Sequence, residues 1–353
     1  MIKEAIRILV ERKELPFEIA QQSMREIMAG EATPSQVGAF LTALRMKGET
    51  VQEVTAFAIV MRENSVRINP RVNGRTVDTC GTGGDQLKTF NVSTTSALVA
   101  AGSGITIAKH GNRSVTSKCG SADVLEAVGV NLNAPPATVQ HAIEDVGVGF
   151  MFAPAFHPAM KNAVMPRREI GIRTVFNILG PLTNPANANA QVVGVYDSNL
   201  VLPLAEVLRK LGTEEALVVH GMDGIDEIST VGKTRLAWVK DGELINREIT
   251  PQDMRLRQAK PTEISGFDVD QSARLMVNIL RGSEDEKSAR LEMVLANAAA
   301  AIVVAGKADD LAEGVEQARK TVSSGRAYEK LKALIEITRG DETKLERIET
   351  RNA

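Results

Sequence analysis

The sequence predicts an α/β protein: a small N-terminal helical domain, then a large α/β domain with a mostly parallel central sheet and surrounding helices. Three observations lead to this prediction. Apolar residues recur at helical spacing through about the first 67 residues. From residue 76 onward, short strand-like runs alternate with helical segments, as in β-α-β crossovers. With 353 residues, 43% of them hydrophobic, the chain is long enough for about two domains with real cores.

The first region, residues 1–70, is expected to hold four short helices. Apolar stripes at helical spacing mark the first two, at Ile2, Ala5, Ile6, Leu9 and Val10, and at Phe17, Ala20, Met24, Ile27 and Met28. Capping-box patterns mark the start of the next two, at Thr33-Pro34-Ser35-Gln36 and Thr50-Val51-Gln52-Glu53. So small a bundle has a limited core, and we expect it to pack on the rest of the chain or on a second subunit.

The second region, residues 71–353, follows a loop or hinge at 69–74 and reads as alternating strands and helices. We expect strands at 76–79, 105–108, 192–196 and 216–219, and a hairpin of 238–240 with 244–246 around Asp241-Gly242. Helices are expected at 201–211, 273–280, 289–304 and 311–323. We interpret the alanine-rich run at 296–301 as a sign of close helix packing.

The composition limits which binding partners and which cellular compartment we expect for this protein. The 42 Lys and Arg against 44 Asp and Glu give a net charge of −2, so no global field gathers nucleic acid or an anionic membrane, and we expect neither as a partner. We find no signal peptide and no apolar run of the ~18 to 20 residues that span a bilayer. The two cysteines, Cys80 and Cys119, are too few for a disulfide framework, and we expect a cytoplasmic protein.

Two segments are suited to binding a phosphorylated ligand. Residues 78–85, DTCGTGGD, are predicted to form the end of a strand and a glycine loop. Residues 89–95, TFNVSTT, are predicted to begin an apolar helix. Backbone amides in glycine loops and at helix N-termini favour the binding of anions. Residues 109–123 follow the next predicted strand with three cations and several hydroxyls. Taken alone, the first segment could equally be a tight turn with ordinary capping, and the second a solvated basic loop.

Two further segments carry charge. The run 221–229, GMDGIDEIS, places adjacent carboxylates after a predicted strand, and hard oxygen ligands near a phosphate are what Mg²⁺ requires. Residues 157–168 offer basic side chains that could hold a carboxylate. Alone, they could be a solvated acidic turn and a solvated helix face. The dinucleotide fingerprint and the P-loop each lack a required glycine, at Gln86 and Glu227, and neither a HExxH helix nor cysteine pairs at zinc spacing occur.

Together these segments resemble the anthranilate phosphoribosyltransferase family of tryptophan biosynthesis over nearly the whole chain. The resemblance rests on GTGGD at 81–85, NVSTT at 91–95, KHGNRSVTSKCGSADVLEAVG at 109–129, HPAMK at 157–161, IRTVFNILGPLTNP at 172–185 and DGIDEIS at 223–229. It implies a helical domain completed by helices from about 165–190, hinges to the α/β domain, and homodimers formed through the helical domains. Thr116 and Cys119 stand where serines are common in the family, and both keep a small side chain.

The resemblance implies transfer of the phosphoribosyl group of 5-phosphoribosyl 1-diphosphate (PRPP) to the amine of anthranilate, with release of pyrophosphate and a requirement for Mg²⁺. It places these residues at PRPP: Gly81, Gly84, Asp85, Thr89, Asn91, Val92, Ser93, Thr94, Lys109, His110, Gly111, Asn112, Arg113, Ser114, Val115, Thr116, Ser117 and Ser121. It places Gly81, Asn112 and Arg167 at anthranilate, with His110 lining the same pocket, and Ser93, Asp226 and Glu227 at the metal.

No residue is assigned as an acid, base or nucleophile, because an oxocarbenium-like transition state needs chiefly a stabilised leaving group and a positioned amine. Two rival functions fit the sequence less well. Pyrimidine nucleoside phosphorylases share the architecture, but phosphorolysis has no diphosphate leaving group for the Asp226 and Glu227 pair to clamp through Mg²⁺. Nucleic-acid-binding relatives should be basic and lack intact substrate motifs, which a net charge of −2 does not fit.

Overall fold

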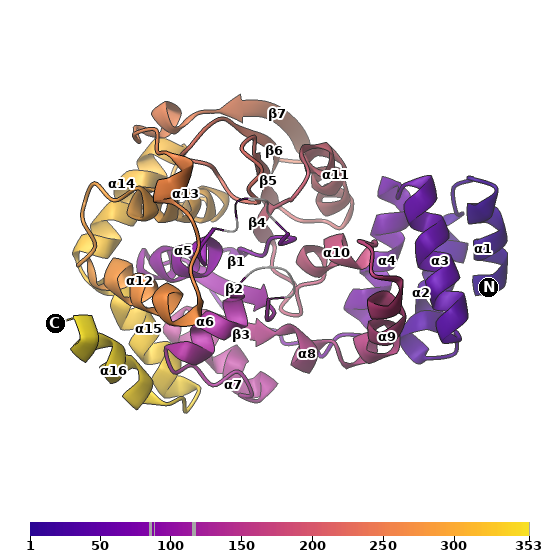
Figure 1. Cartoon of the computed structure of the whole chain (residues 1–353), viewed down its shortest axis with the longest axis horizontal. Coiled ribbons are helices and arrows are strands. Elements are labelled where there is room, and N and C mark those ends of the chain that lie inside the picture. The colour runs from indigo at the N-terminus through magenta and orange to yellow at the C-terminus, as the bar shows by residue number, and fades with distance from the viewer. Residues whose placement is uncertain (85–86, 88, 115–117, 353) are drawn as a thin grey trace.

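The computed structural model describes residues 1–84, 87, 89–114 and 118–352. A helical region that contains the N-terminus lies at one end of the molecule, and a larger region in which helices surround a sheet lies at the other (Figure 1). The predicted fold class is confirmed.

The N-terminal bundle consists of α1 (Ile2–Val10), α2 (Phe17–Ala29), α3 (Pro34–Lys47) and α4 (Val51–Glu63). Both predicted capping boxes are confirmed at the starts of α3 and α4: the amide of Gln36 donates to Thr33 Oγ1 (3.3 Å) and that of Glu53 to Thr50 Oγ1 (3.2 Å). The fully buried Glu53 carboxylate also accepts hydrogen bonds from Lys47 Nζ (2.7 Å) and the Leu15 amide (2.9 Å), so this buried charge is paired.

A later segment packs on this bundle. Helix α9 (Lys161–Ile170) lies against α2 and α3, and α10 (Phe176–Leu179) lies against α4. Asn162 Nδ2 donates to the Met28 carbonyl (2.8 Å), and Arg62 Nε donates to the Leu182 carbonyl (2.7 Å). Residues far apart in the sequence therefore share one apolar core, which also reaches α11 (Val201–Lys210) and one face of the sheet.

The sheet has seven strands in the order β3-β2-β1-β4-β5-β6-β7. Their bounds are β1 (Thr76–Asp78), β2 (Thr106–Gly111), β3 (Val148–Phe152), β4 (Ala190–Gly194), β5 (Glu215–Gly221), β6 (Thr234–Lys240) and β7 (Glu243–Ile249). The first five pair in parallel, and β6 and β7 are antiparallel. The hairpin predicted at Asp241-Gly242 is confirmed, and both residues have the positive φ (51° and 78°) that a two-residue hairpin turn favours.

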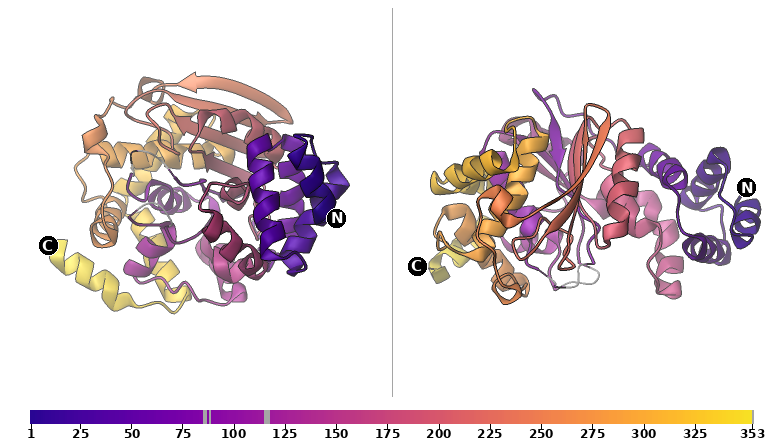
Figure 2. Two further views of the ribbon diagram at one scale, coloured as in Figure 1. Left: turned by 45° about the vertical axis from the view of Figure 1, so that its right-hand side comes forward. Right: turned by 90° about the horizontal axis from the view of Figure 1, so that it is seen from above.

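Helices cover both faces of the sheet (Figure 2). One face packs on α5, α6 and α12–α15, and the other on α11 and the helical region. The bounds are α5 (Val92–Gly102), α6 (Ser121–Ala127), α7 (Pro136–His141), α8 (Ala153–Phe156), α12 (Val269–Arg281), α13 (Ala289–Val304), α14 (Leu311–Ser323), α15 (Arg326–Ile337) and α16 (Glu342–Asn352). A π-helical turn (Ala142–Val146) and 3-10 turns at Pro158–Met160, Gly180–Leu182, Ser198–Leu200, Pro251–Met254 and Pro261–Glu263 join them.

Strand β3 is not among the strands predicted from the sequence. Its five residues, VGFMF, form a short apolar run without alternation, which does not distinguish a strand from a buried helix segment. These residues form a strand because they pair with β2, from Ile107↔Val148 to Gly111↔Phe152.

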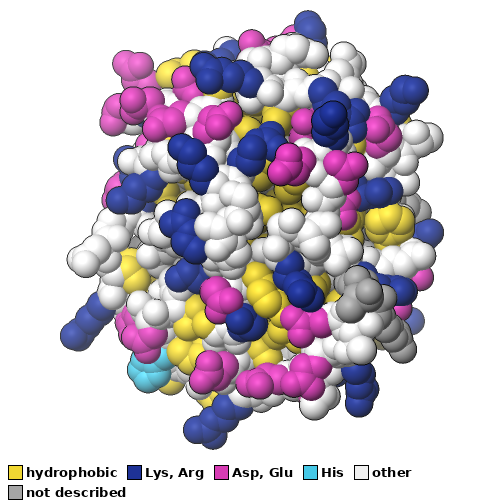
Figure 3. Space-filling model, turned by 90° about the vertical axis from the view of Figure 1, so that its left-hand side faces the viewer, with side chains coloured by type: hydrophobic (Ala, Val, Ile, Leu, Met, Phe, Trp, Pro, Cys, Tyr) yellow, Lys and Arg dark blue, Asp and Glu magenta, His cyan; other side chains and the backbone are white. Residues whose placement is uncertain are grey.

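Charges are mixed on the outside of the larger region. On the face formed by the C-terminal helices, Lys and Arg side chains alternate with Asp and Glu (Figure 3). Among the described residues, no helix is both long enough and apolar enough to cross a membrane.

Candidate active site

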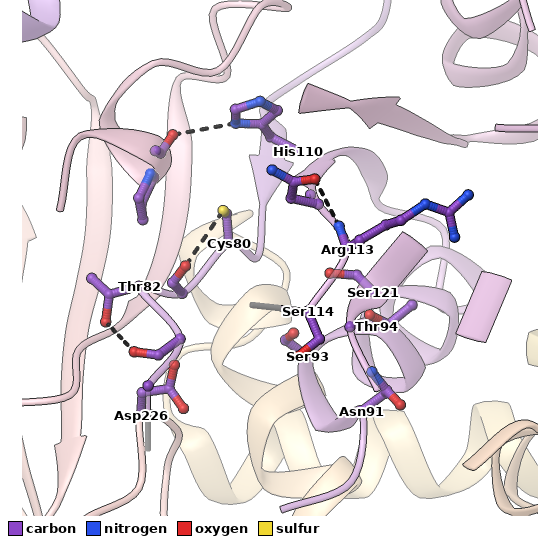
Figure 4. Close-up of a pocket in the computed structure, with 18 of the residues that line it drawn as sticks. Cys80, Thr82, Asn91, Ser93, Thr94, His110, Arg113, Ser114, Ser121 and Asp226 are labelled. Carbon is purple, nitrogen blue, oxygen red and sulfur yellow. Dashed lines mark hydrogen bonds between the residues drawn. The ribbon is translucent and has the colours of Figure 1, made fainter. Parts of the chain in front are cut away.

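The candidate site lies where the strand order of the sheet reverses. Strand β1 pairs in parallel with β2 on one side and β4 on the other, so the segments that follow these strands diverge and leave a crevice at their carboxyl ends. In parallel sheets this position is where ligands bind. A cavity of about 360 Å³ occupies it, with Asp226 and Thr82 on one side and Ser93, Thr94, Ser114 and Ser121 on the other (Figure 4).

The glycine loop after β1 forms one wall of the cavity. Gly83 (φ 65°) and Gly84 (φ 84°) adopt left-handed backbone conformations that glycine favours. The Thr82 amide donates to the Gly194 carbonyl at the end of β4 (2.8 Å), and the Tyr196 amide donates to Thr82 Oγ1 (3.1 Å). The loop is therefore fastened to the neighbouring strand.

The start of α5 faces the same space. Asn91 is the N-cap residue, and Ser93 and Thr94 in the first turn line the cavity. The Ser93 amide donates to Glu227 Oε1 (3.2 Å). Amides at a helix N-terminus bind anions, so this turn can hold a phosphate group when a ligand is present.

Two buried ionisable groups, Lys109 and Asp78, lie at the cavity floor, and Lys109 is one of the lining residues. Lys109 in β2 is 3% exposed, and its Nζ donates to the Thr79 carbonyl (2.7 Å), Thr79 Oγ1 (3.2 Å) and Ser93 Oγ (3.4 Å). Burial lowers its pKa, and the charge of Asp78 opposes that shift. Burial likewise raises the pKa of Asp78 to about 6, although Lys109 and the hydrogen bond from Asn184 Nδ2 (2.7 Å) favour its charged form. Lys109 thus places a positive charge beside the helix start.

Two neutral histidines stand side by side, and one of them, His110, lines the cavity. Burial lowers the pKa of His110 to about 3 and that of His157 to about 4. Their ring centroids are 5.0 Å apart, and His110 Nδ1 is 3.2 Å from the Gly180 carbonyl oxygen, which fixes Nδ1 as the protonated nitrogen. His110 Nε2 is buried with no partner among the described residues.

The segment after β2 is organised by one carboxylate. Asp123 accepts hydrogen bonds from the amides of Gly120 (2.9 Å) and Ser114 (3.0 Å), and it pairs with the Arg113 guanidinium (3.0 Å). Arg113 also pairs with Glu126 (2.8 Å) and extends away from the cavity (Figure 4). Arg113 therefore lines the cavity chiefly with its backbone and stem.

The acidic turn follows β5. Its backbone packs so closely on Gly194 that an added Cβ there would lie 1.5 Å from the Asp226 carbonyl oxygen. Asp226 Oδ2 is 3.1 Å from the position a Cβ would take on Gly81. The carboxylates of Asp226 and Glu227 thus face the glycine loop and the start of α5 across the cavity. These hard oxygen donors, with the Ser93 hydroxyl, suit Mg²⁺.

A second cluster of metal-ligand types is a poor cation site. Single donor atoms of Asp78, Cys80 and His110 lie within 4.8 Å of one another. Burial raises the pKa of the Cys80 thiol and so favours its protonated form, and His110 Nδ1 binds the Gly180 carbonyl. The Lys109 ammonium already supplies the positive charge beside Asp78.

The helical region contributes the remaining wall. Arg167 on α9 is half-buried, and its guanidinium carbon lies 5.1 Å from the centroid of the Phe176 ring. Arg173, on the link between α9 and α10, stacks over the Tyr196 ring at 4.0 Å and donates from a terminal guanidinium nitrogen to the Gly84 carbonyl (3.0 Å). The link therefore contacts the glycine loop directly.

Every sequence-predicted site residue that the structure describes lines this one cavity: Gly81, Gly84, Thr89, Asn91, Val92, Ser93, Thr94, Lys109, His110, Gly111, Asn112, Arg113, Ser114, Ser121, Arg167, Asp226 and Glu227. Asp85, Val115, Thr116 and Ser117 lie outside the described residues. Sequence reasoning gave no role to Phe176, Asn177, Gly180, Pro181 or Tyr196, which also line it. The first four belong to the quoted motif at 172–185, which was the available signal.

Known proteins are similar to this chain in sequence and fold. Residues 73–328 match the glycosyl transferase family, a/b domain, and residues 3–65 match the glycosyl transferase family, helical bundle domain. The anthranilate phosphoribosyltransferase of Geobacter sulfurreducens is 50% identical over 351 residues, covering 96% of this chain and 99% of that protein. The crystal structure of the anthranilate phosphoribosyltransferase from Thermus thermophilus is 41% identical with a TM-score of 0.89, covering 95% of this chain and 99% of that one.

The Saccharomyces cerevisiae anthranilate phosphoribosyltransferase is similar too, and it has been solved with ligands. Its complex with PRPP and Mg is 26% identical with a TM-score of 0.87, and its complex with 4-fluoroanthranilate is 25% identical with a TM-score of 0.85. Each alignment covers 96% of this chain and 97% of the yeast chain.

Proposed function

This chain belongs to the anthranilate phosphoribosyltransferase family, and we propose that the cavity at the ends of β1, β2 and β4 is where it performs the family's reaction. The enzyme transfers the phosphoribosyl group of PRPP to the amine of anthranilate, giving N-(5-phosphoribosyl)anthranilate and pyrophosphate, in tryptophan biosynthesis. The observation that carries the assignment of the site is the convergence of glycine loop, helix start, acidic turn and Arg167 on one cavity.

The diphosphate and ribose of PRPP bind between the glycine loop, the first turn of α5 and the segment after β2. The start of α5 at the cavity, the small residues in the loop and the Lys109 charge support this placement. The residues assigned to PRPP are the eighteen predicted from the sequence, of which Asp85 and 115–117 lie outside the described part of the chain.

Mg²⁺ is the metal cofactor, and Asp226, Glu227 and the Ser93 hydroxyl would hold it against the diphosphate. When bound, the cation neutralises the negative charge that builds on the leaving pyrophosphate. The fit is supported by hard oxygen donors on two sides of one cavity.

Anthranilate binds on the side of the helical region, near Gly81, Asn112 and Arg167. The Arg167 guanidinium suits the carboxylate, and the neutral His110 lines the same cavity. These contacts orient the amine toward C1 of the ribose, while amides and Lys109 stabilise the leaving group, so the chain supplies no nucleophile.

The domain division, assembly and compartment complete the proposal. Residues 1–70, with helices from about 165–190, form the helical domain, and residues 71–353 form the catalytic domain. The contacts of α9 with α2 and α3 support this division.

Exposed Val10 (69%) and Met46 (72%) on α1 and α3 support a homodimer formed through the helical domains. Cys80 and Cys119 are thiols and not a disulfide, which supports a cytoplasmic location.

The test is a coupled assay on purified protein. With anthranilate, PRPP and Mg²⁺, anthranilate fluorescence should fall as pyrophosphate appears in equal amount, and omission of Mg²⁺ should stop both signals. Folded protein that consumes no anthranilate but splits thymidine or uridine in phosphate would replace this function by nucleoside phosphorolysis.

A further inference from the structure

A buried asparagine stands in the alanine-rich part of helix α13, in the core of the larger region. Asn297 in α13 is 3% exposed, and the residues on either side of it, Ala296 and Ala298, are fully buried. Its Oδ1 accepts a hydrogen bond from the Ile228 amide (2.9 Å), and its Nδ2 donates to the Ile228 carbonyl (3.1 Å) and to the Met293 carbonyl (2.9 Å). All the polar atoms of this side chain have partners, and two of its three hydrogen bonds are to the backbone of Ile228.

That backbone residue comes directly after Glu227. Ile228 lies in no strand or helix, and its side chain is fully buried. Buried peptide groups need partners, and here the side chain of Asn297 takes the place that a neighbouring strand would fill. An apolar side chain at 297 would leave the Ile228 amide and carbonyl without them, and the backbone that carries Glu227 would have to move.

Helix α13 also contacts α5, the helix whose first turn faces the acidic turn. Ser96 Oγ in α5 donates to the Val294 carbonyl of α13 (3.0 Å), and α13 packs along α5. The Ser93 amide, at the start of α5, donates to Glu227 Oε1 (3.2 Å). One buried helix therefore sets the position of α5 through Val294 and that of the acidic turn through Asn297.

We propose that Asn297 is a positioning residue for the divalent cation, because it holds the acidic turn at a fixed distance from the first turn of α5. This inference rests on the proposed function, which places the cation between Ser93, Asp226 and Glu227. Groups that orient metal ligands without touching the metal commonly affect its affinity by about 10- to 100-fold.

The test measures cation binding separately from turnover. Mn²⁺ is titrated into the full-length protein with PRPP, and free Mn²⁺ is followed by electron paramagnetic resonance. For Asn297→Leu we expect the Mn²⁺ dissociation constant, and the Mg²⁺ concentration for half-maximal turnover, to rise by about 10-fold or more. Turnover should largely recover at saturating Mg²⁺. Asn297→Ala removes the same hydrogen bonds with a smaller side chain in an alanine-rich stretch, so it should raise the Mn²⁺ dissociation constant similarly, and it serves if the leucine variant does not fold.

The matched control is Leu295→Ala. Leu295 is fully buried in the same helix but lies about 200° around it from Asn297, so the variant loses core packing on another face. It should lower the melting temperature and leave the Mn²⁺ titration unchanged. Equal Mn²⁺ affinity in wild type and both Asn297 variants, or an equal loss in Leu295→Ala, would overturn the inference. If the wild type binds no Mn²⁺ in the presence of PRPP, the cation site of the proposed function is rejected, and the inference about Asn297 is rejected with it.

Discussion

At the scale of single residues, Arg167 has the properties of a carboxylate receptor. It is half-buried, and it forms no ion pair with any residue in the described part of the chain. Burial lowers its pKa, yet a guanidinium stays charged at any assay pH. Contact with the Phe176 ring holds it at the cavity wall.

We therefore expect Arg167→Ala to raise the KM for anthranilate about 10- to 100-fold, the equivalent of about 1.5–3 kcal/mol for a charge-assisted hydrogen bond. The KM for PRPP should stay near the wild-type value. Arg168→Ala, which removes the exposed neighbour on the same helix, is the control. Equal losses for both substrates would contradict the assignment of Arg167 to anthranilate.

The acidic pair makes a prediction of its own. Asp226→Asn combined with Glu227→Gln keeps the size of both side chains but removes both negative charges. The Mg²⁺ concentration for half-maximal turnover should rise at least about 10-fold, since carboxylates supply most of the attraction to the cation. An unchanged Mg²⁺ titration would reject these two residues as ligands.

His157 makes the stability of the fold depend on pH. In the folded chain burial lowers its pKa to about 4, whereas in the unfolded chain it titrates near 6.5. Between those values only the unfolded chain takes up this proton, so the histidine's contribution to the free energy of unfolding falls as pH falls through that window, by up to about 1.4 kcal/mol per pH unit.

Urea unfolding of wild type and His157→Gln at pH 7 and pH 5 checks this sign. The free energy of unfolding of wild type relative to the variant should be smaller at pH 5. Asp78 with its raised pKa is common to both proteins and cancels in the difference, whereas His157 also lowers the pKa of His110, which changes the difference in the same direction. Equal differences at the two pH values would show that His157 is not buried as a neutral group.

At the scale of elements, the α9–α10 link connects the helical region to the glycine loop. Arg173 makes the connection through Gly84 and Tyr196. A loop already held in its binding shape loses less entropy when the ligand arrives. The link therefore prepares the glycine loop for the diphosphate.

From this we expect Arg173→Ala to raise the KM for PRPP about 5- to 10-fold, the size of one net hydrogen bond, with kcat little changed. Arg173→Lys should recover part of the loss, because an ammonium can still donate to the Gly84 carbonyl. A fall in kcat at unchanged KM would indicate instead that Arg173 acts on the reacting groups.

At the scale of the whole molecule, the cavity is built between two bodies that are distant in the chain. Its floor comes from the strand ends, and its outer wall comes from α9 and α10, which pack on the N-terminal bundle (Figure 1). The exposed apolar side chains of that bundle lie on α1 and α3, and they suit a second copy of the chain.

The proposed homodimer predicts twice the chain mass in size-exclusion chromatography with light scattering. Met46→Asp should shift the protein toward the single-chain mass, because a charge at a buried apolar interface is costly. Lys320→Asp on the exposed surface of α14, away from the helical domain, is a control for a charge change alone. A single-chain mass for wild type at all concentrations would remove the homodimer from the proposal.

The fold could be predicted from the sequence wherever local signals were strong. Helical spacing and two capping hydroxyls defined α3 and α4, and Asp241-Gly242 defined a hairpin, because these patterns act over a few neighbouring residues. Strand β3 could not be predicted in this way, since its conformation depends on pairing with β2. The strand order, with its reversal at β1, is likewise a property of long-range pairing.

For the site, too, some features could be predicted from local sequence patterns and others depend on the tertiary structure. The sequence by itself determined which chemical groups are present: glycines and a helix start for phosphates, a pair of carboxylates for Mg²⁺, and an arginine for a carboxylate. Only the tertiary structure decided how they are arranged. Arg113 turns outward to Asp123 and Glu126, Tyr196 joins the wall, and Asn297 reaches the acidic turn from a helix 69 residues later in the chain. Spacing along the chain fixes local geometry, whereas contacts between distant segments depend on how the whole core packs.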